Sequence, residues 1–282
     1  GAGRAAGRRC SARARSAGLH FCGSPSDAAG HRVTCLVRSE EKLRHFVAPD
    51  DLDGVVVLTG DASEPECAEA ALGAGRFEAL VSTAGFIDRG ARDEESQRRS
   101  ELHRLVCTLA TAAERWLPAP GRAVFMGGMP ALSLPGITPE ALLADQPGIG
   151  RAYAVHLLNY ERLRRSSLDW SLVCPGPMVA RPASAPDLVL NADALPDFAP
   201  GAFRPWMLGF PFGWPLVAAR VARRLGKLTV SYADCARAVV ALLEPGSPFK
   251  RCRVGLANPG GLRHKRTSRD RAEAAEHRSW TA

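Results

Sequence analysis

Length, composition and charge exclude several classes of protein for this chain of 282 residues. Hydrophobic residues at 46% and charged residues at 23% are ordinary for a soluble globular protein, and one core can accommodate a chain of this length. No apolar run approaches the roughly 20 residues that cross a bilayer. We therefore expect no integral membrane segment.

The formal net charge of +8 lies in the two ends of the chain. Residues 1–26 hold five arginines and no acid, and residues 263–282 hold six basic and three acidic residues. These tails contribute the whole excess, so the body between them is formally neutral. A neutral body lacks the basic surface that follows a phosphate backbone. We therefore expect no nucleic acid on the folded body.

The cysteine pattern indicates a reducing compartment. The eight cysteines are widely scattered, with no Cys-x-x-Cys pair and no Cys/His quartet at zinc spacing. We expect free thiols, no structural metal and a cytoplasmic protein. An organelle is the alternative, because the first residues are rich in Arg, Ala and Ser and lack acids, as transit peptides do.

From residue 31 onward, predicted strands and helices alternate. The strands are expected at 32–37, 55–58, 79–82, 123–126 and 169–173, and the helices between them at 40–46, 64–72, 101–115 and 153–166. Continuous apolar runs such as Val55-Val56-Val57-Leu58 are typical of parallel strands covered on both faces. This order predicts an α/β fold with a doubly wound, mostly parallel, Rossmann-like sheet.

The pattern loosens after residue 178, where prolines and aromatics become frequent. We expect helices at 216–225 and 234–243, and a substrate cover over the sheet edge. Extra core, or a membrane-surface helix at 216–227, are the alternatives. The predicted organisation is an atypical basic N-terminal segment at 1–29, one domain at 30–257 whose cover spans about 178–257, and a basic polar tail at 258–282.

The stretch from Tyr153 to Met178 points to a small-molecule site. It reads as a helix with one apolar stripe, then a short buried strand, then a Pro-Gly-Pro loop. The prolines end the strand because they cannot continue a hydrogen-bonded ladder. Open α/β sheets bind their ligands at such strand ends.

The same stretch resembles the helix and LDW-(T/S)-(I/L)-V-x-P-G block of the atypical short-chain dehydrogenases, particularly the NmrA-like and biliverdin/flavin reductase-like group. Four more segments resemble that family in order: 30–38, 60–62, 81–85 and 231–236. The resemblance covers about residues 30–257. It implies an NAD(P)-binding oxidoreductase or isomerase for a small organic molecule. The alternative is a non-catalytic, NmrA-like nucleotide-sensing or scaffold protein. The oligomeric state cannot be inferred.

The resemblance also implies a set of cofactor-binding residues. A basic residue at Arg38 favours NADP, because a guanidinium makes paired bonds to a 2′-phosphate, with NAD as the alternative. Asp61 would accept from the adenine amino group, although Gly60-Asp61 is also an ordinary turn and helix cap. The residues expected around the cofactor are Arg38, Asp61, Ala62, Ser82, Thr83, Ala84, Gly85, Pro175, Gly176 and Pro177.

The catalytic pattern of the family is incomplete here. Short-chain dehydrogenases usually use a serine after the fifth strand and a Tyr-x-x-x-Lys pair. Gly127 or Gly128 takes the place of the serine, and Leu157 takes the place of the lysine. His156 could act as a general acid or orient the substrate, or be a partly exposed helix residue. The candidate catalytic residues are Tyr153, His156 and Tyr160, the last of which could instead be a core aromatic.

The start of the chain departs from the family. A dinucleotide fold begins with an apolar strand, a glycine-rich turn and a helix. Residues 1–32 contain no valine or isoleucine, and Gly1, Gly3 and Gly7 match the turn spacing without a strand before them. We expect the first strand and the glycine-rich loop to be degraded or missing. A transit peptide, a mistranslated or mis-spliced replacement and a disordered tail are the three explanations considered.

Overall fold

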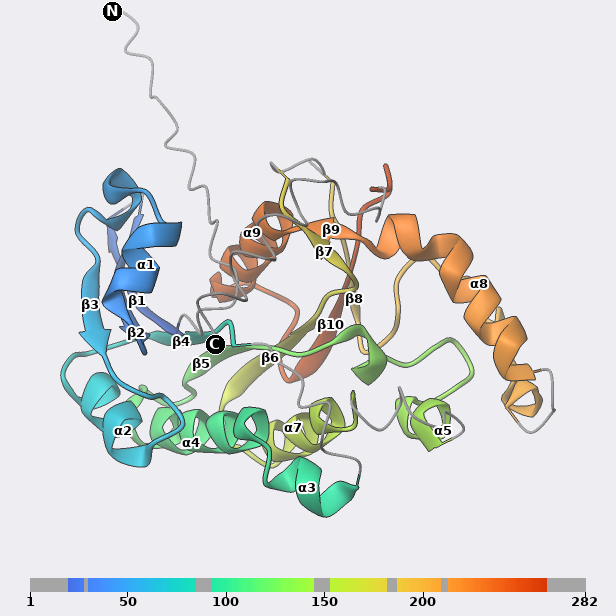
Figure 1. Ribbon diagram of the computed structural model, residues 1–282, viewed down its shortest axis with the longest axis horizontal. Coiled ribbons are helices and arrows are strands. Elements are labelled where there is room, and N and C mark those ends of the chain that lie inside the picture. Colours follow the sequence, from blue (N-terminus) through green and yellow to red (C-terminus); the bar gives the residue numbers. More distant parts are fainter. Residues whose placement is uncertain are drawn as a thin grey trace, which may run out of the picture.

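The main sheet has eight strands in the order β3-β2-β1-β4-β5-β6-β10-β8 (Figure 1). The computed structural model describes residues 20–27, 30–84, 93–144, 153–181, 187–208 and 213–262. The strands of this sheet are β1 (His20–Asp27), β2 (Gly30–Val37), β3 (Val56–Thr59), β4 (Ala79–Ser82), β5 (Arg122–Met126), β6 (Asp169–Cys174), β8 (Val189–Ala192) and β10 (Cys252–Ala257). A separate pair consists of β7 (Met178–Val179) and β9 (Val230–Ser231).

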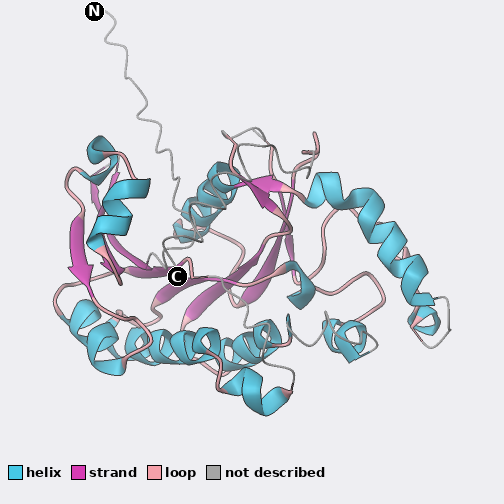
Figure 2. Ribbon diagram, in the orientation of Figure 1, coloured by secondary structure: helices cyan, strands magenta, loops and turns pink. Residues whose placement is uncertain are grey.

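Helices cover both faces of this sheet (Figure 2). Three of them, α2, α4 and α7, pack in a row on one face, while α1 and α9 lie on the other. The helices are α1 (Glu40–Phe46), α2 (Pro65–Gly73), α3 (Glu94–Arg98), α4 (Glu101–Trp116), α5 (Pro139–Ala144), α7 (Val155–Arg164), α8 (Gly213–Leu228) and α9 (Tyr232–Leu243). Short 3-10 turns are η1 (Pro49–Leu52), η2 (Met129–Ala131) and η3 (Pro205–Met207).

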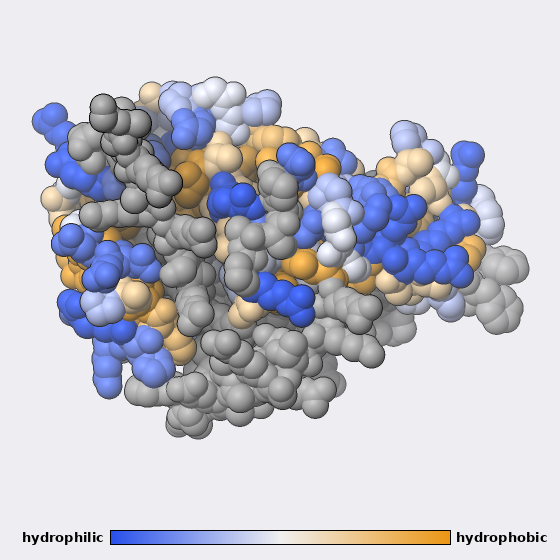
Figure 3. Space-filling model, turned by 90° about the horizontal axis from the view of Figure 1, so that it is seen from above, coloured by the Kyte–Doolittle hydropathy of each residue, from blue (hydrophilic) through white to orange (hydrophobic). Residues whose placement is uncertain are grey.

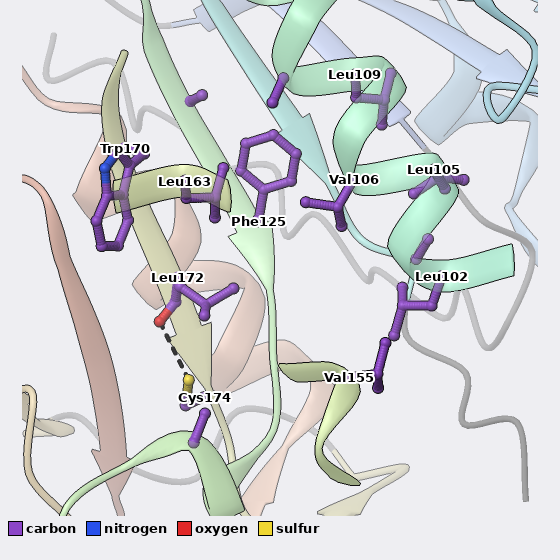
Figure 4. Packing of buried hydrophobic residues seen from close by; sticks show 14 of the residues in the cluster. Leu102, Leu105, Val106, Leu109, Phe125, Val155, Leu163, Trp170, Leu172 and Cys174 are labelled. Carbon is purple, nitrogen blue, oxygen red and sulfur yellow. Dashed lines mark hydrogen bonds between the residues drawn. The ribbon is translucent and has the colours of Figure 1, made fainter. Parts of the chain in front are cut away.

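The core follows from the alternation of side chains along the strands. Phe125 of β5 is fully buried against the apolar stripe of α4, whereas its neighbours Val124 and Met126 face α9 (Figure 4). Helix α4 begins at Ser100, whose hydroxyl accepts the His103 N–H at 3.3 Å. These layers confirm the predicted α/β class, and the strands at 32–37, 79–82, 123–126 and 169–173 are confirmed within two residues.

The strand expected at 55–58 is present as β3, and it is covered only partly: Val57 packs against the cluster on the α1 face and Leu58 against the cluster on the α2 face. Among the described strands, β3 pairs only with β2, so it lies at one edge of the sheet, and Val56 is 55% exposed. Its apolar run therefore suits an edge strand that packs partly on both faces and leaves Val56 exposed.

A strand occupies residues 20–27, although the sequence there lacks an apolar pattern. β1 pairs with β2 and with β4, and it runs antiparallel to both. Backbone groups on the facing edges of β2 and β4 need partners, and any extended segment can supply them. The strand is thus present at the sheet centre, but the parallel β1–turn–helix unit of the family is not formed: only residues 28 and 29 lie between Asp27 and Gly30.

The C-terminal part of the fold carries a long basic helix. α8 extends away from the sheet and packs against η3 and β10 (Figure 1). Its exposed side is mostly hydrophilic in the view of Figure 3. Arg224 and Lys227 contact the Asp197 carboxylate at 2.7 and 3.3 Å. The helix is longer than the expected 216–225, because Leu228 at its end is also buried. None of the described helices is long and apolar enough to cross a bilayer.

Candidate functional site

The predicted site residues follow the carboxyl ends of the parallel strands, and the strand registers bring these ends to one edge of the sheet. Val37 of β2 lies opposite Thr59 of β3, and Gly60 donates its N–H to the Val37 oxygen at 2.9 Å. β1 separates this strand pair from β4, β5 and β6. Arg38, Asp61 and Ala62 therefore lie on one side of β1, and the predicted residues that follow β4 and β6 lie on the other.

A charged cluster forms at the first half of this edge. Arg38 follows β2, Asp61 follows β3, and Arg104 comes from α4. The Arg38 Nη1 lies 3.0 Å from Glu101 Oε1, and the Arg104 Nη2 donates to Ser63 Oγ at 3.1 Å. Three elements far apart in the sequence thus bring two guanidinium groups to the place where the resemblance puts the adenosine end of a cofactor.

Asp61 stays ionised within this cluster. Burial alone would raise the pKa of its carboxyl, but hydrogen bonds from Ser63 and the charges of Arg38 and Arg104 lower the pKa below the ordinary value. The Ser63 N–H donates to Asp61 Oδ1 at 2.8 Å, and Ala62 between them is buried. Asp61 therefore serves as the cap of the turn and remains a hydrogen-bond acceptor with a negative charge.

The loop after β4 provides small residues beside β1. Ser82 and Ala84 are buried and Thr83 is half-buried. Ser82 pairs with His20 of β1 on one side and with Phe125 of β5 on the other. Gly85, predicted as part of the same loop, lies outside the described residues.

The Pro-Gly-Pro loop after β6 is held firmly in place. The Pro175 oxygen accepts the Met129 N–H, and the Pro177 oxygen accepts the Val230 N–H, both at 3.1 Å. A Cβ on Gly176 would lie 2.4 Å from the Leu228 oxygen, so only glycine fits there without a shift. The loop thus links the end of β5, the end of α8 and β9 at the second half of the edge.

His156 is buried beneath the loop after β5. It is 3% exposed, and its Nδ1 has no hydrogen-bond partner among the described residues. Burial lowers the pKa of this imidazole to about 4. A Cβ on Gly128 would lie 2.7 Å from His156 Nε2. Gly128, one of the two glycines at the position of the family's serine, therefore leaves the space that the His156 ring occupies. The lowered pKa keeps His156 neutral at neutral pH.

We expect the burial of His156 to appear in the pH dependence of stability. The unfolded chain takes up a proton on this residue below about pH 6.5, and the folded chain only near pH 4. The free energy of unfolding should therefore fall as the pH drops between these values, by roughly 2–3 kcal/mol from this group. His156→Gln should lack that component in urea denaturation at neutral and mildly acidic pH. Equal slopes in both proteins would contradict this assignment.

The two tyrosines differ in their surroundings. The Tyr153 ring centroid is 6.2 Å from that of His156, so these two predicted residues lie together at the start of α7. Tyr160 packs edge-on against Trp170 at 5.9 Å, and the Arg253 guanidinium lies 4.5 Å from its ring centre. Tyr160 is therefore partly buried between a core tryptophan and a cation, as the core-aromatic alternative expected.

Next to His156 lies a series of contacting polar side chains that was not predicted from the sequence. Asn159 is fully buried on α7, and its Oδ1 lies 2.8 Å from His103 Nδ1 of α4, while its Nδ2 has no partner within the described ranges. The His103 Nε2 is 3.6 Å from Cys107 Sγ. The sequence feature that could have predicted it is an asparagine at helical spacing between the apolar residues Val155 and Leu163.

A dinucleotide, which the resemblance implies, fits this edge only in part. Arg38, Asp61 and the small residues after β4 suit an adenosine ribose and its 2′-phosphate. The diphosphate normally lies at the N-terminus of the helix after the first strand. Here β1 runs in the opposite direction and leads directly into β2, so this unit is not formed. The described residues also bring together no group of His, Cys, Asp or Glu that could hold a metal ion.

The strand order and the site at the carboxyl edge define a nucleotide-binding protein of the Rossmann-like class. A family model described as NAD(P)H-binding matches residues 16–198, well over half of the sequence. The chain therefore belongs to the NAD(P)H-binding family, which agrees with the cofactor class that the resemblance implied. None of the curated proteins matches the chain significantly in sequence.

Several solved structures are similar to this chain. A protein from Lactobacillus casei is 19% identical, with a TM-score of 0.51 over 81% of this chain and 88% of that one. ChuY, an anaerobillin reductase from Escherichia coli O157:H7, is 16% identical, with a TM-score of 0.49 over 80% and 84%. A short-chain dehydrogenase/reductase from Veillonella parvula DSM 2008, solved in complex with NADP, is 17% identical, with a TM-score of 0.47 over 79% and 82%.

Proposed function

We propose that this chain binds NADP(H) and acts as a nucleotide sensor or scaffold of the NmrA-like type. The observation that supports binding is the cluster of Arg38, Asp61 and Arg104. Two guanidinium groups favour a phosphate, and Arg38 stands where the family meets the ribose 2′-position. The bound partner is therefore a small molecule with a phosphorylated adenosine.

The second part of the proposal is that binding does not lead to efficient turnover. Proton exchange with a carbonyl needs a donor whose pKa lies near the working pH. His156 is buried and neutral, with its pKa lowered to about 4. Gly127 or Gly128 takes the place of the serine, and Leu157 that of the lysine, that would otherwise assist Tyr153. The residues expected around the adenosine half of the nucleotide are thus present, whereas the serine and lysine expected for proton transfer are replaced.

The test is calorimetric titration of the whole chain with NADPH, together with Glu101→Gln. Glu101 is the carboxylate that contacts Arg38. Its neutralisation frees Arg38 and removes a charge that repels phosphate, so NADPH should bind about three- to tenfold more tightly.

The matched control is Glu69→Gln, which removes the partner of Arg115 in a similarly exposed pair outside the charged cluster and should leave the affinity unchanged. Absence of NADPH binding to the unmodified chain would refute the proposal. A lower affinity in Glu101→Gln would refute the place given to the phosphate.

A reductase of a small organic molecule is the second candidate function. Nicotinamide, when bound, supplies a hydride in such enzymes. The observation that favours this candidate is the pair of buried polar atoms, His156 Nδ1 and Asn159 Nδ2, that lack partners within the described part of the chain. A neutral His156 could orient a substrate through such an atom. NADPH consumption with quinone or flavin acceptors separates the two candidates.

A further inference from the structure

The direction of β1 changes what the centre of the site can bind. At the carboxyl edge, His20 at the start of β1 lies opposite Leu36 of β2 and Ser82 of β4. The end of β1 lies at the opposite edge, where Asp27 pairs with Gly30. The chain therefore enters the central strand at the place where, in a dinucleotide fold, it would leave the strand and begin a phosphate-binding turn.

The described helices at this edge do not replace the missing donors. α1 follows β2, and its Ser39 cap already accepts the Lys42 N–H at 3.2 Å. Glu40 and Glu41 lie in its first turn, where their charges oppose a phosphate. The start of α4 is capped in the same way by Ser100 and carries Glu101 in its first turn. The start of α2, which follows Asp61, has no side-chain cap, but its cap residue Glu64 and Glu66 in its first turn are acidic. The three described helix starts next to the charged cluster thus all carry acids that oppose a phosphate.

We propose that this chain holds a 2′-phosphorylated adenosine nucleotide by its adenosine half, and that the diphosphate adds little to the affinity. This inference rests on the proposed NADP(H) binding. The affinity is located at Arg38 and Arg104, on the β2–β3 side of β1. Nucleotides that share the 2′-phosphoadenosine group are therefore bound alike, whether or not they carry a nicotinamide.

The experiment is calorimetric titration of the whole chain with three probes. These probes are 2′,5′-ADP, 2′-phospho-ADP-ribose and NADPH, which share the 2′-phosphoadenosine group and add the diphosphate and the nicotinamide in steps. We expect their dissociation constants to agree within about fivefold, and nicotinamide mononucleotide not to bind. Two charge-assisted hydrogen bonds to a diphosphate would instead separate the first probe from the others by about a hundredfold. A gap of that size would overturn the inference.

Two variants show where the affinity lies. Arg38→Ala should weaken all three probes by the same factor, about tenfold. Arg44→Ala is the control, since Arg44 has the same side-chain exposure of 60% and a similar carboxylate partner. Unequal losses among the probes in Arg38→Ala would count against the inference. If no probe binds the unmodified chain, the proposed function itself fails. If NADPH binds tightly and 2′,5′-ADP binds weakly, the proposed function stands and only the inference about the adenosine half is overturned.

Discussion

Replacing Arg38 by glutamate is expected to weaken NADPH binding by about thirtyfold while leaving NADH binding within about threefold. The guanidinium is 60% exposed at the end of β2, and a 2′-phosphate could form paired bonds with it in competition with Glu101. A carboxylate in its place would repel the phosphate and accept from the ribose 2′-hydroxyl of NADH instead. Titration of both nucleotides against both proteins gives the ratio directly.

The control for this charge reversal is Arg44→Glu. Arg44 lies on α1, and its contact with Glu40 matches the Arg38–Glu101 contact in exposure. Arg44→Glu changes the net charge by the same amount as Arg38→Glu, but Arg44 lies outside the charged cluster. The dissociation constants of NADPH and NADH should therefore change by less than about threefold. Surface ion pairs contribute at most about 1 kcal/mol to stability, so both variants should unfold at nearly the same urea concentration. An equal loss of NADPH affinity in the two variants would show a general charge effect rather than a phosphate site.

Local sequence patterns predict the elements of this fold well where the helix or strand ends are marked by the residues themselves. Helix α1 spans the expected 40–46, because Ser39 caps it, acids lie in its first turn, and Arg44 and His45 lie in its last turn. The strand before the Pro-Gly-Pro loop is likewise confirmed as β6, since Pro175 ends the ladder there.

Long-range partners could not be predicted in this way. β1 has no apolar pattern and is held by the backbones on either side, so no local feature of residues 20–27 indicates it. The contact between Arg38 and Glu101 spans 63 residues. The burial of His156 depends on the absence of a Cβ at Gly128, which is nearly thirty residues earlier. Each of these features depends on contacts between segments that are far apart in the sequence or that have no pattern of their own, so local patterns could not predict it.

The same dependence on neighbours gives a substitution of Gly176 a large expected effect on stability. An alanine Cβ there would lie 2.4 Å from the Leu228 oxygen, a backbone atom at the end of α8 that cannot rotate away. The Pro-Gly-Pro loop or α8 must move, although Met129 and Val230 hold the loop through backbone hydrogen bonds. We expect Gly176→Ala to lower the free energy of unfolding by about 2–3 kcal/mol in urea denaturation.

Gly246→Ala is the matched control for this substitution. No atom lies within 4 Å of the Cβ that an alanine would carry there, so its effect should stay within about 0.5 kcal/mol. The binding of 2′,5′-ADP should be unchanged in Gly176→Ala under conditions where it is folded, because Arg38 and Arg104 lie across β1 from the loop. If Gly176→Ala unfolds at the same urea concentration as Gly246→Ala, the loop is not packed against α8, and the second half of the edge is open rather than closed by the end of that helix.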